Sequence, residues 1–158
     1  MKPWFNTDER IAALWTEQQR WFGTPFIAHA ASHGHGVDCV NLQHEIFANV
    51  GAIPRLELPA YSLDYAKHST RPQLLLFLLT HPQLAGRFVM VAPSGKLAPG
   101  DLIGLRSGRV DHHLASVNPW DEAVHAIEEV GVVRTKLNDA KFAARVLYVM
   151  RLMEVDAA

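Results

Sequence analysis

The sequence predicts an α+β domain in which helices come first and strands follow. In several stretches between residues 7 and 84, apolar side chains recur with helical spacing. From residue 88 onward, short apolar runs are separated by Gly, Pro, Asn or Asp at roughly ten-residue intervals, as in an antiparallel meander. This order is typical of helices gathered on an antiparallel sheet. We therefore expect N-terminal helices packed on a sheet of about five strands.

The first helix is expected to begin after Thr7 and to continue to Phe22. Thr7 can cap the helix, Asp8 suits its first turn, and apolar residues follow with helical spacing. The run Gly23-Thr-Pro25 ends it. Residues 27–37 are mostly small and rich in glycine and histidine, which predicts a loop.

Two further helices are expected before the strands. The first runs from about Asp38 to Asn49, with Gly51 closing it as a C-cap. Residues 54–65 contain two prolines and are expected to be extended. The next helix covers residues 71–84 and has Pro72 in its first turn, where a missing N–H costs nothing.

Five runs have strand character, each bounded by turn residues. They are Phe88–Val91, Asp101–Arg106, His113–Val117, Ala123–Ile127 and Val132–Lys136. The C-terminal segment, residues 139–153, has both helical and strand character. Residues 139–146 read as a helix, and residues 146–153 are compatible with a final strand.

Composition narrows the class of protein. The length of 158 residues fits a single domain, residues 1–158, with a substantial core. The net charge is −1 with no basic block, which argues against nucleic-acid binding. The N-terminus lacks the apolar core of a signal peptide, and the longest apolar run, Leu74–Leu79, is too short to span a bilayer. We expect a protein that is cytoplasmic as synthesised and has no cofactor; its oligomeric state stays open.

Cys39, the one cysteine of the chain, is expected at a helix start after a glycine-rich loop. Free N–H groups and the helix dipole stabilise an anion there, so the pKa of the thiol should fall below its ordinary value of about 8.5. A lone cysteine with histidines elsewhere is a candidate nucleophile. The alternative is a buried cysteine that packs as a small apolar side chain.

Five stretches in order give this chain a family resemblance. They are Trp21-Phe-Gly-Thr-Pro-Phe26, Gly36-Val-Asp-Cys39-Val-Asn-Leu42, Pro99-Gly-Asp-Leu-Ile103, His113-Leu-Ala-Ser-Val117 and Ala123-Val-His125-Ala126. Together they resemble motifs of the NlpC-type cell-wall peptidases, which are papain-like cysteine hydrolases. Within that family they resemble the branch found in phage and prophage tail gene clusters.

The resemblance implies a papain-like fold and a Cys-His-His triad. Cys39 would attack a carbonyl, His113 would act as base, and His125 would orient His113. The substrate would be a peptidoglycan stem peptide, cut at its D-glutamyl–diaminopimelate bond. The spacing agrees, because a hairpin centred at residue 119 pairs His113 with His125 on one face of the sheet.

Several positions near the cysteine depart from the family pattern. Phe26 stands where the family has tyrosine, Val40 where serine is common, and Asn41 where glycine is common; Asp38 is retained. The resemblance implies that these positions bind substrate. Their departures motivate two alternatives, a binding or assembly module of a phage-tail-like system that has lost activity, and an amidase or acyltransferase with another acyl substrate.

The other histidines near these motifs need a separate interpretation. His112 precedes the proposed base and would point to the opposite face of a strand. There it is either exposed to solvent or, with a one-residue slip, the base itself, and we count it among the substrate-binding positions. His33-Gly-His35 with Cys39 offers imidazole and thiolate ligands, but the spacing fits no common zinc pattern. We expect no metal and interpret this loop as the rim of the active-site cleft.

Overall fold

The first two helices form where the sequence predicts them. The computed structural model describes residues 1–59 and 71–155. Helix α1 spans Asp8–Arg20, and the side chain of Thr7 accepts a hydrogen bond from the Arg10 amide as its cap. Helix α2 spans Cys39–Asn49 and is capped in the same way by Asp38. Both predictions are confirmed.

Helix α4 spans Gln73–Thr80 and follows Pro72, so it is shorter than predicted. The chain leaves the helical conformation at His81, whose ψ is 131°. Pro82 explains the early end, because a proline disfavours the helical conformation of the residue before it. The predicted extended segment 54–65 has no regular secondary structure up to Pro59, and its remainder lies outside the described residues.

The predicted loop 27–37 contains a small hairpin. Strand β1 (Ala31–Ser32) pairs antiparallel with β2 (Gly36–Val37). Gly34, at the turn, has a φ of +77°, a conformation that glycine adopts without a steric penalty. Both strands are too short for a periodicity argument to find, since two residues cannot alternate more than once.

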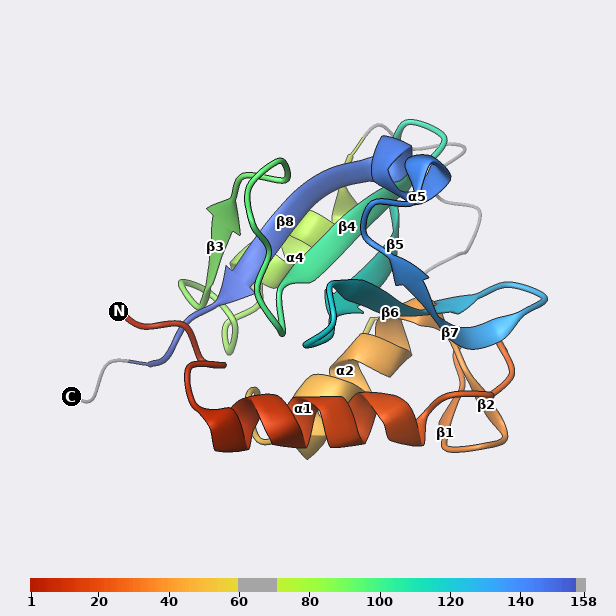
Figure 1. Cartoon of the computed structure of the whole chain (residues 1–158), viewed down its shortest axis with the longest axis horizontal. Coiled ribbons are helices and arrows are strands. Elements are labelled where there is room, and N and C mark those ends of the chain that lie inside the picture. The colour runs from red at the N-terminus through yellow and green to blue at the C-terminus, as the bar shows by residue number, and fades with distance from the viewer. Residues whose placement is uncertain (60–70, 156–158) are drawn as a thin grey trace.

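Within the described residues the main sheet has six strands, one more than the number predicted, and all its neighbours are antiparallel. In spatial order the strands are β3 (Phe88–Val91), β8 (Val146–Leu152), β4 (Leu102–Ser107), β5 (Val110–Val117), β6 (Glu122–Ile127) and β7 (Gly131–Lys136). The extra strand is the chain's last, β8, which inserts between β3 and β4 after the short helix α5 (Ala140–Arg145). Figure 1 shows β6 and β7 turning away from the other strands.

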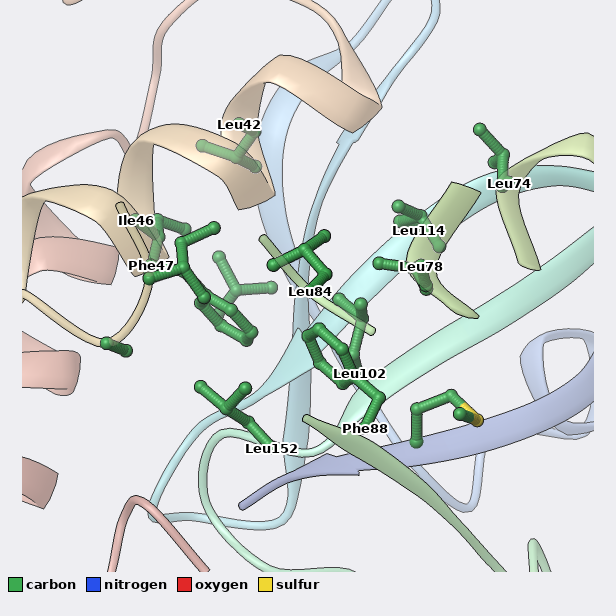
Figure 2. Packing of buried hydrophobic residues seen from close by; sticks show 14 of the residues in the cluster. Leu42, Ile46, Phe47, Leu74, Leu78, Leu84, Phe88, Leu102, Leu114 and Leu152 are labelled. Atoms are coloured by element: carbon green, nitrogen blue, oxygen red, sulfur yellow. The ribbon is translucent and has the colours of Figure 1, made fainter. Parts of the chain in front are cut away.

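The two faces of the sheet carry separate apolar clusters. The larger cluster joins α1, α2 and α4 to one face, and Figure 2 shows part of it, including Phe47, Leu78 and Leu102. The smaller cluster lies on the other face, where Phe142 of α5 packs with Leu105 and its neighbours. The helices that precede the strands in sequence therefore cover one face of the sheet, as predicted.

The Pro99-Gly-Asp101 motif joins neighbouring parts of the sheet. Asp101 is 1% exposed, and both its carboxylate oxygens accept hydrogen bonds from Arg151 of β8 at 2.8 Å. One of them also accepts from the amide of Ala98. A buried carboxylate is tolerated because it is paired in this bidentate way. The motif thus ties the start of β4 to β8.

Strands β5 and β6 are paired only near the turn that connects them. Their ladder holds only the pairs Ser116–Val124 and Val117–Ala123, and we call this short ladder the β5–β6 seam. At its edge, the buried side chain of Gln43 from α2 donates to the carbonyl oxygens of Leu114 and Val124. One side chain of a helix therefore links the two strands where their ladder ends. In residues 1–59 and 71–155, no helix is long and apolar enough to cross a membrane.

Candidate active site

Cys39 is the first residue of helix α2, as the sequence predicts. Its side chain is 2% exposed, and its Sγ lies 3.6 Å from the carbonyl oxygen of His112 on β5. The position at the helix start places the sulfur where backbone N–H groups favour an anion. Burial fits the alternative of an apolar cysteine as well, so the choice between them depends on the groups beside the thiol.

His113 of β5 and His125 of β6 form a hydrogen bond. The His113 Nε2 atom lies 2.8 Å from His125 Nδ1, and the two ring centroids are 5.0 Å apart. The predicted strand register is wrong, since the ladder is centred at residue 120 and its continuation would set His125 opposite Ala115. The slip is two residues, which keeps every side chain on its face. The two rings therefore meet diagonally.

His125 has two further neighbours that the sequence analysis missed. Its Nε2 lies 2.8 Å from the hydroxyl oxygen of Thr135 on β7. The ring of Phe142 stands edge-on to it, with centroids 5.5 Å apart and an interplanar angle of 89°. A threonine in an alternating strand carries no signal of its own, and Thr135 could be found only from the β6–β7 register.

A pocket of about 230 Å³ brings most of the predicted site residues together. Its lining consists of Phe26, Cys39, Leu105, Ser107, His112, His113, His125, Ile127, Glu128, Phe142 and Arg145. Phe26 and His112, predicted to bind substrate, thus share the pocket with the proposed triad. Val40 and Asn41 line two other hollows.

Asp38 lies beneath the helix start. It is 0% exposed, and its carboxylate accepts from the amide of His29 at 2.7 Å and from the amide and side chain of Asn41 at 2.8 and 3.0 Å. In the described residues it caps α2 and anchors the preceding loop. Its effect on the pocket therefore runs through the position of Cys39, the next residue.

Both imidazoles are held uncharged. Burial lowers the pKa of His113 well below its usual range, and the charges of His125, Arg145 and His112 lower it further. Burial, with a smaller effect of Arg145, lowers the pKa of His125 to about 4. At neutral pH His113 is therefore a neutral base.

Arg145 supplies positive charge to the pocket and was not singled out from the sequence. It is the last residue of α5, and its Nε and one terminal nitrogen donate to the carbonyl oxygen of Arg106 at 3.1 and 3.0 Å. These two bonds fix the orientation of an otherwise exposed guanidinium. The pocket therefore carries a positioned cation beside two neutral imidazoles.

The His33-Gly-His35 loop has a structural explanation. The ring of His33 makes a hydrogen bond with the carbonyl oxygen of Arg20 and stands edge-on to Trp21, with centroids 5.4 Å apart. Residues 1–59 and 71–155 contain no group of three or more His, Cys, Asp or Glu side chains that could hold a metal ion. His33 does not line the pocket of Cys39.

Comparison with solved structures identifies the architecture. An NLP/P60-family protein from Staphylococcus aureus, described as similar to a lipoprotein, matches over 97% of this chain and 44% of its own, with a TM-score of 0.65 and 18% identity. An NlpC/P60-family protein from Bacillus cereus matches over 91% of this chain and 40% of its own, with a TM-score of 0.63 and 22% identity. The NlpC/p60 domain of the peptidoglycan hydrolase SagA matches over 87% of this chain and 95% of its own, with a TM-score of 0.54 and 19% identity. The chain has the papain-like NlpC/P60 fold.

The coverage and the sequence identity of these matches determine what can be concluded from them. The chain spans less than half the length of the first two proteins and nearly all of the SagA domain. At identities of 18–22% the likeness is one of fold. No protein-family model and no curated protein sequence matches the chain. A function for this NlpC/P60 fold therefore has to be argued from its pocket.

Proposed function

We propose that this chain is a cysteine-dependent amide hydrolase whose triad is Cys39, His113 and His125. One observation carries the proposal. A thiol at a helix start shares one pocket with a pair of hydrogen-bonded, uncharged imidazoles. A nucleophile, a base and a group that orients the base are the parts that acyl transfer needs.

The reaction follows from these parts. The Cys39 proton passes to His113 as the sulfur forms a bond to the substrate carbonyl carbon. The Cys39 backbone N–H at the helix start helps to stabilise the resulting oxyanion. His113 then gives the proton to the amine as the C–N bond breaks, which leaves a thioester. Water attacks the thioester with His113 again as base, and the acid product and free thiol are released.

We propose a peptidoglycan stem peptide as substrate, cut between D-glutamate and diaminopimelate. The SagA domain, which shares the fold, belongs to a peptidoglycan hydrolase. In a γ-linked D-glutamyl residue the α-carboxylate is free and lies close to the scissile amide. Arg145, oriented at the pocket by its two bonds to the Arg106 carbonyl, can bind such a carboxylate.

Purified muropeptides and mass spectrometry test this function. The wild-type chain should release fragments cut at the D-glutamyl bond, and Cys39→Ser should release none while remaining folded. Arg145→Gln should raise KM about tenfold or more, because it loses a charge-assisted contact. Lys141→Gln, the same charge change on an exposed part of α5, should leave KM unchanged. Cleavage by Cys39→Ser, or equal KM values for the two helix variants, would contradict these roles.

The lack of a hydroxyl at Phe26 motivates a second candidate, a binding or assembly module. Phe26 lines the pocket but offers only an apolar ring where the family pattern has tyrosine. If the chain is an enzyme with an altered substrate, such as an amidase or acyltransferase, Phe26→Tyr should shift its preference or raise kcat on stem peptides. If neither form cleaves any stem peptide and Cys39 reacts as an ordinary thiol, the binding module is the better proposal.

We also propose delivery to the cell wall by phage-type machinery. The motif resemblance to the tail-associated branch supports it. An antibody to the chain, applied to purified tail particles from the strain that encodes it, tests it. Detection in the particles is expected, and detection only in particle-free cell extract would contradict it.

A further inference from the structure

The hydroxyl of Thr135 is the feature of the site that the proposed triad leaves unused. Thr135 lies on β7, and its oxygen is 2.8 Å from the second ring nitrogen of His125. His113, His125 and Thr135 therefore form one chain of hydrogen bonds across three neighbouring strands. The effect of these hydrogen bonds on His113 depends on which ring nitrogens carry the hydrogens.

His113 has one nitrogen left for the thiol. Its Nε2 is engaged with His125 Nδ1, so Nδ1 must receive the proton of Cys39. A neutral imidazole carries a hydrogen on one nitrogen and a lone pair on the other. His113 is therefore a base only when its hydrogen is on Nε2 and is donated to His125.

The tautomer that His113 needs in turn fixes the tautomer of His125. To accept from His113, His125 must keep its Nδ1 bare and carry its hydrogen on Nε2, which faces Thr135. The reverse arrangement, in which Thr135 donates to His125 and His125 donates to His113, puts a hydrogen on His113 Nδ1 and blocks it. An asparagine in the place of His125 would always offer an acceptor oxygen, but a histidine offers an acceptor nitrogen in one tautomer only.

When His113 is protonated during the reaction, only one arrangement of hydrogens is possible. Protonated His113 donates from Nε2, so His125 must accept there and must donate from its own Nε2. His125 is 5% exposed, so without Thr135 that N–H would be buried and unpaired. Thr135 is half-buried and can give its own hydrogen to solvent while its oxygen accepts. The edge-on ring of Phe142 packs against His125 on the same site.

We propose that Thr135 is a positioning residue, which accepts a hydrogen bond from His125 Nε2 and thereby keeps His113 in the tautomer that can take the proton of Cys39. The effect on turnover rests on the proposed hydrolase function, whereas the tautomers are a property of the resting protein. Thr135 is not among the residues that line the pocket of Cys39, and it acts through two rings.

NMR of histidine ring nitrogens in ¹⁵N-labelled full-length protein tests the tautomers at pH 7.5 without a substrate. Wild type and Thr135→Ser should carry the hydrogen of both His113 and His125 on Nε2. Thr135→Val, which keeps the shape and removes the hydroxyl, should shift both toward Nδ1. Thr80→Val, which removes a hydroxyl that donates to the Leu76 carbonyl within α4, should change neither ring. Nδ1–H tautomers in wild type, or unchanged tautomers in Thr135→Val, would overturn the proposal.

Kinetics on the cleaved muropeptide give the second measurement. Thr135→Val should lower kcat about tenfold with little change in KM, and Thr135→Ser should restore it. A purely structural role would instead move KM, or stability, in both variants. If wild type cleaves no stem peptide, the proposed function fails while the NMR result still decides the role of Thr135. If Thr135→Val does not fold, the wild-type and Thr135→Ser tautomers decide it.

Discussion

The side-chain nitrogen of Gln43 lies 2.9 Å from the carbonyl oxygen of Val124 and 3.4 Å from that of Leu114. Gln43 belongs to the helix that begins with Cys39, and the two carbonyls belong to the residues beside His125 and His113. One buried amide group therefore sets the distance between the helix of the thiol and both strands of the imidazoles.

Replacing Gln43 by leucine should weaken the fold and the site together. The substitution removes a hydrogen-bond donor to two buried carbonyl groups, which should lower the free energy of unfolding by about 1–3 kcal/mol in a denaturant titration. Gln83→Leu, on an exposed turn, should change it by less than about 0.5 kcal/mol. Equal effects of the two substitutions would mean that the amide bridge contributes nothing.

The two adjacent histidines of β5 should differ sharply in a hydrolysis assay. His113→Ala removes the proposed base and should reduce kcat about a thousandfold or more, because members of a triad act as a unit. His112→Ala should do much less, since its contact with Cys39 is made by the main-chain carbonyl, which alanine retains. The opposite ranking would show that His112 is the base.

The acid limb of kcat/KM should lie at unusually low pH. This limb reports the pKa of the base in the free enzyme, and burial lowers the pKa of both histidines. The pair should therefore remain active at pH 5.5, where an ordinary histidine with a pKa of about 6.5 is mostly protonated. A limb centred at or above pH 6.5 would contradict the neutral, buried pair.

Stability should fall as the pH drops from about 6.5 toward 4. In this window unfolded His125 binds a proton and folded His125, with its pKa of about 4, does not, so acid favours the unfolded chain. The full shift corresponds to roughly 3 kcal/mol. Chemical denaturation at several pH values should show a weaker acid dependence for His125→Gln than for wild type. Parallel curves would mean that His125 is not the cause.

Much of the fold follows from local signals in the sequence. The caps Thr7 and Asp38 fix two helix starts, and the alternating runs locate β3 to β7 within a few residues. The stretches that contain Cys39 and His113 come together at one pocket. These features depend on neighbours in the chain, which is why a sequence can predict them.

The missed features depend on contacts between distant residues. The order of the strands, with β8 inserted between β3 and β4, has no local signal. The register of His113 and His125 depends on a turn whose length the sequence leaves open by two residues. Thr135 and Arg145 reach the site from elements that the motifs do not include. The roles in substrate binding given to Phe26, Asp38, Val40, Asn41 and His112 stay predictions.

The shortness of the β5–β6 seam divides the sheet into two bodies that can fluctuate separately. Strands β6 and β7 share six residue pairs, whereas the seam that joins them to the remaining strands holds two. Amide hydrogen exchange should therefore show β6 and β7 opening as one cooperative unit, at a lower free energy than β4, β5 and β8. His125 and Thr135 would move with that unit and His113 would not. Each opening would interrupt the His113–His125 bond, so the fraction of molecules with an aligned site would depend on this local equilibrium.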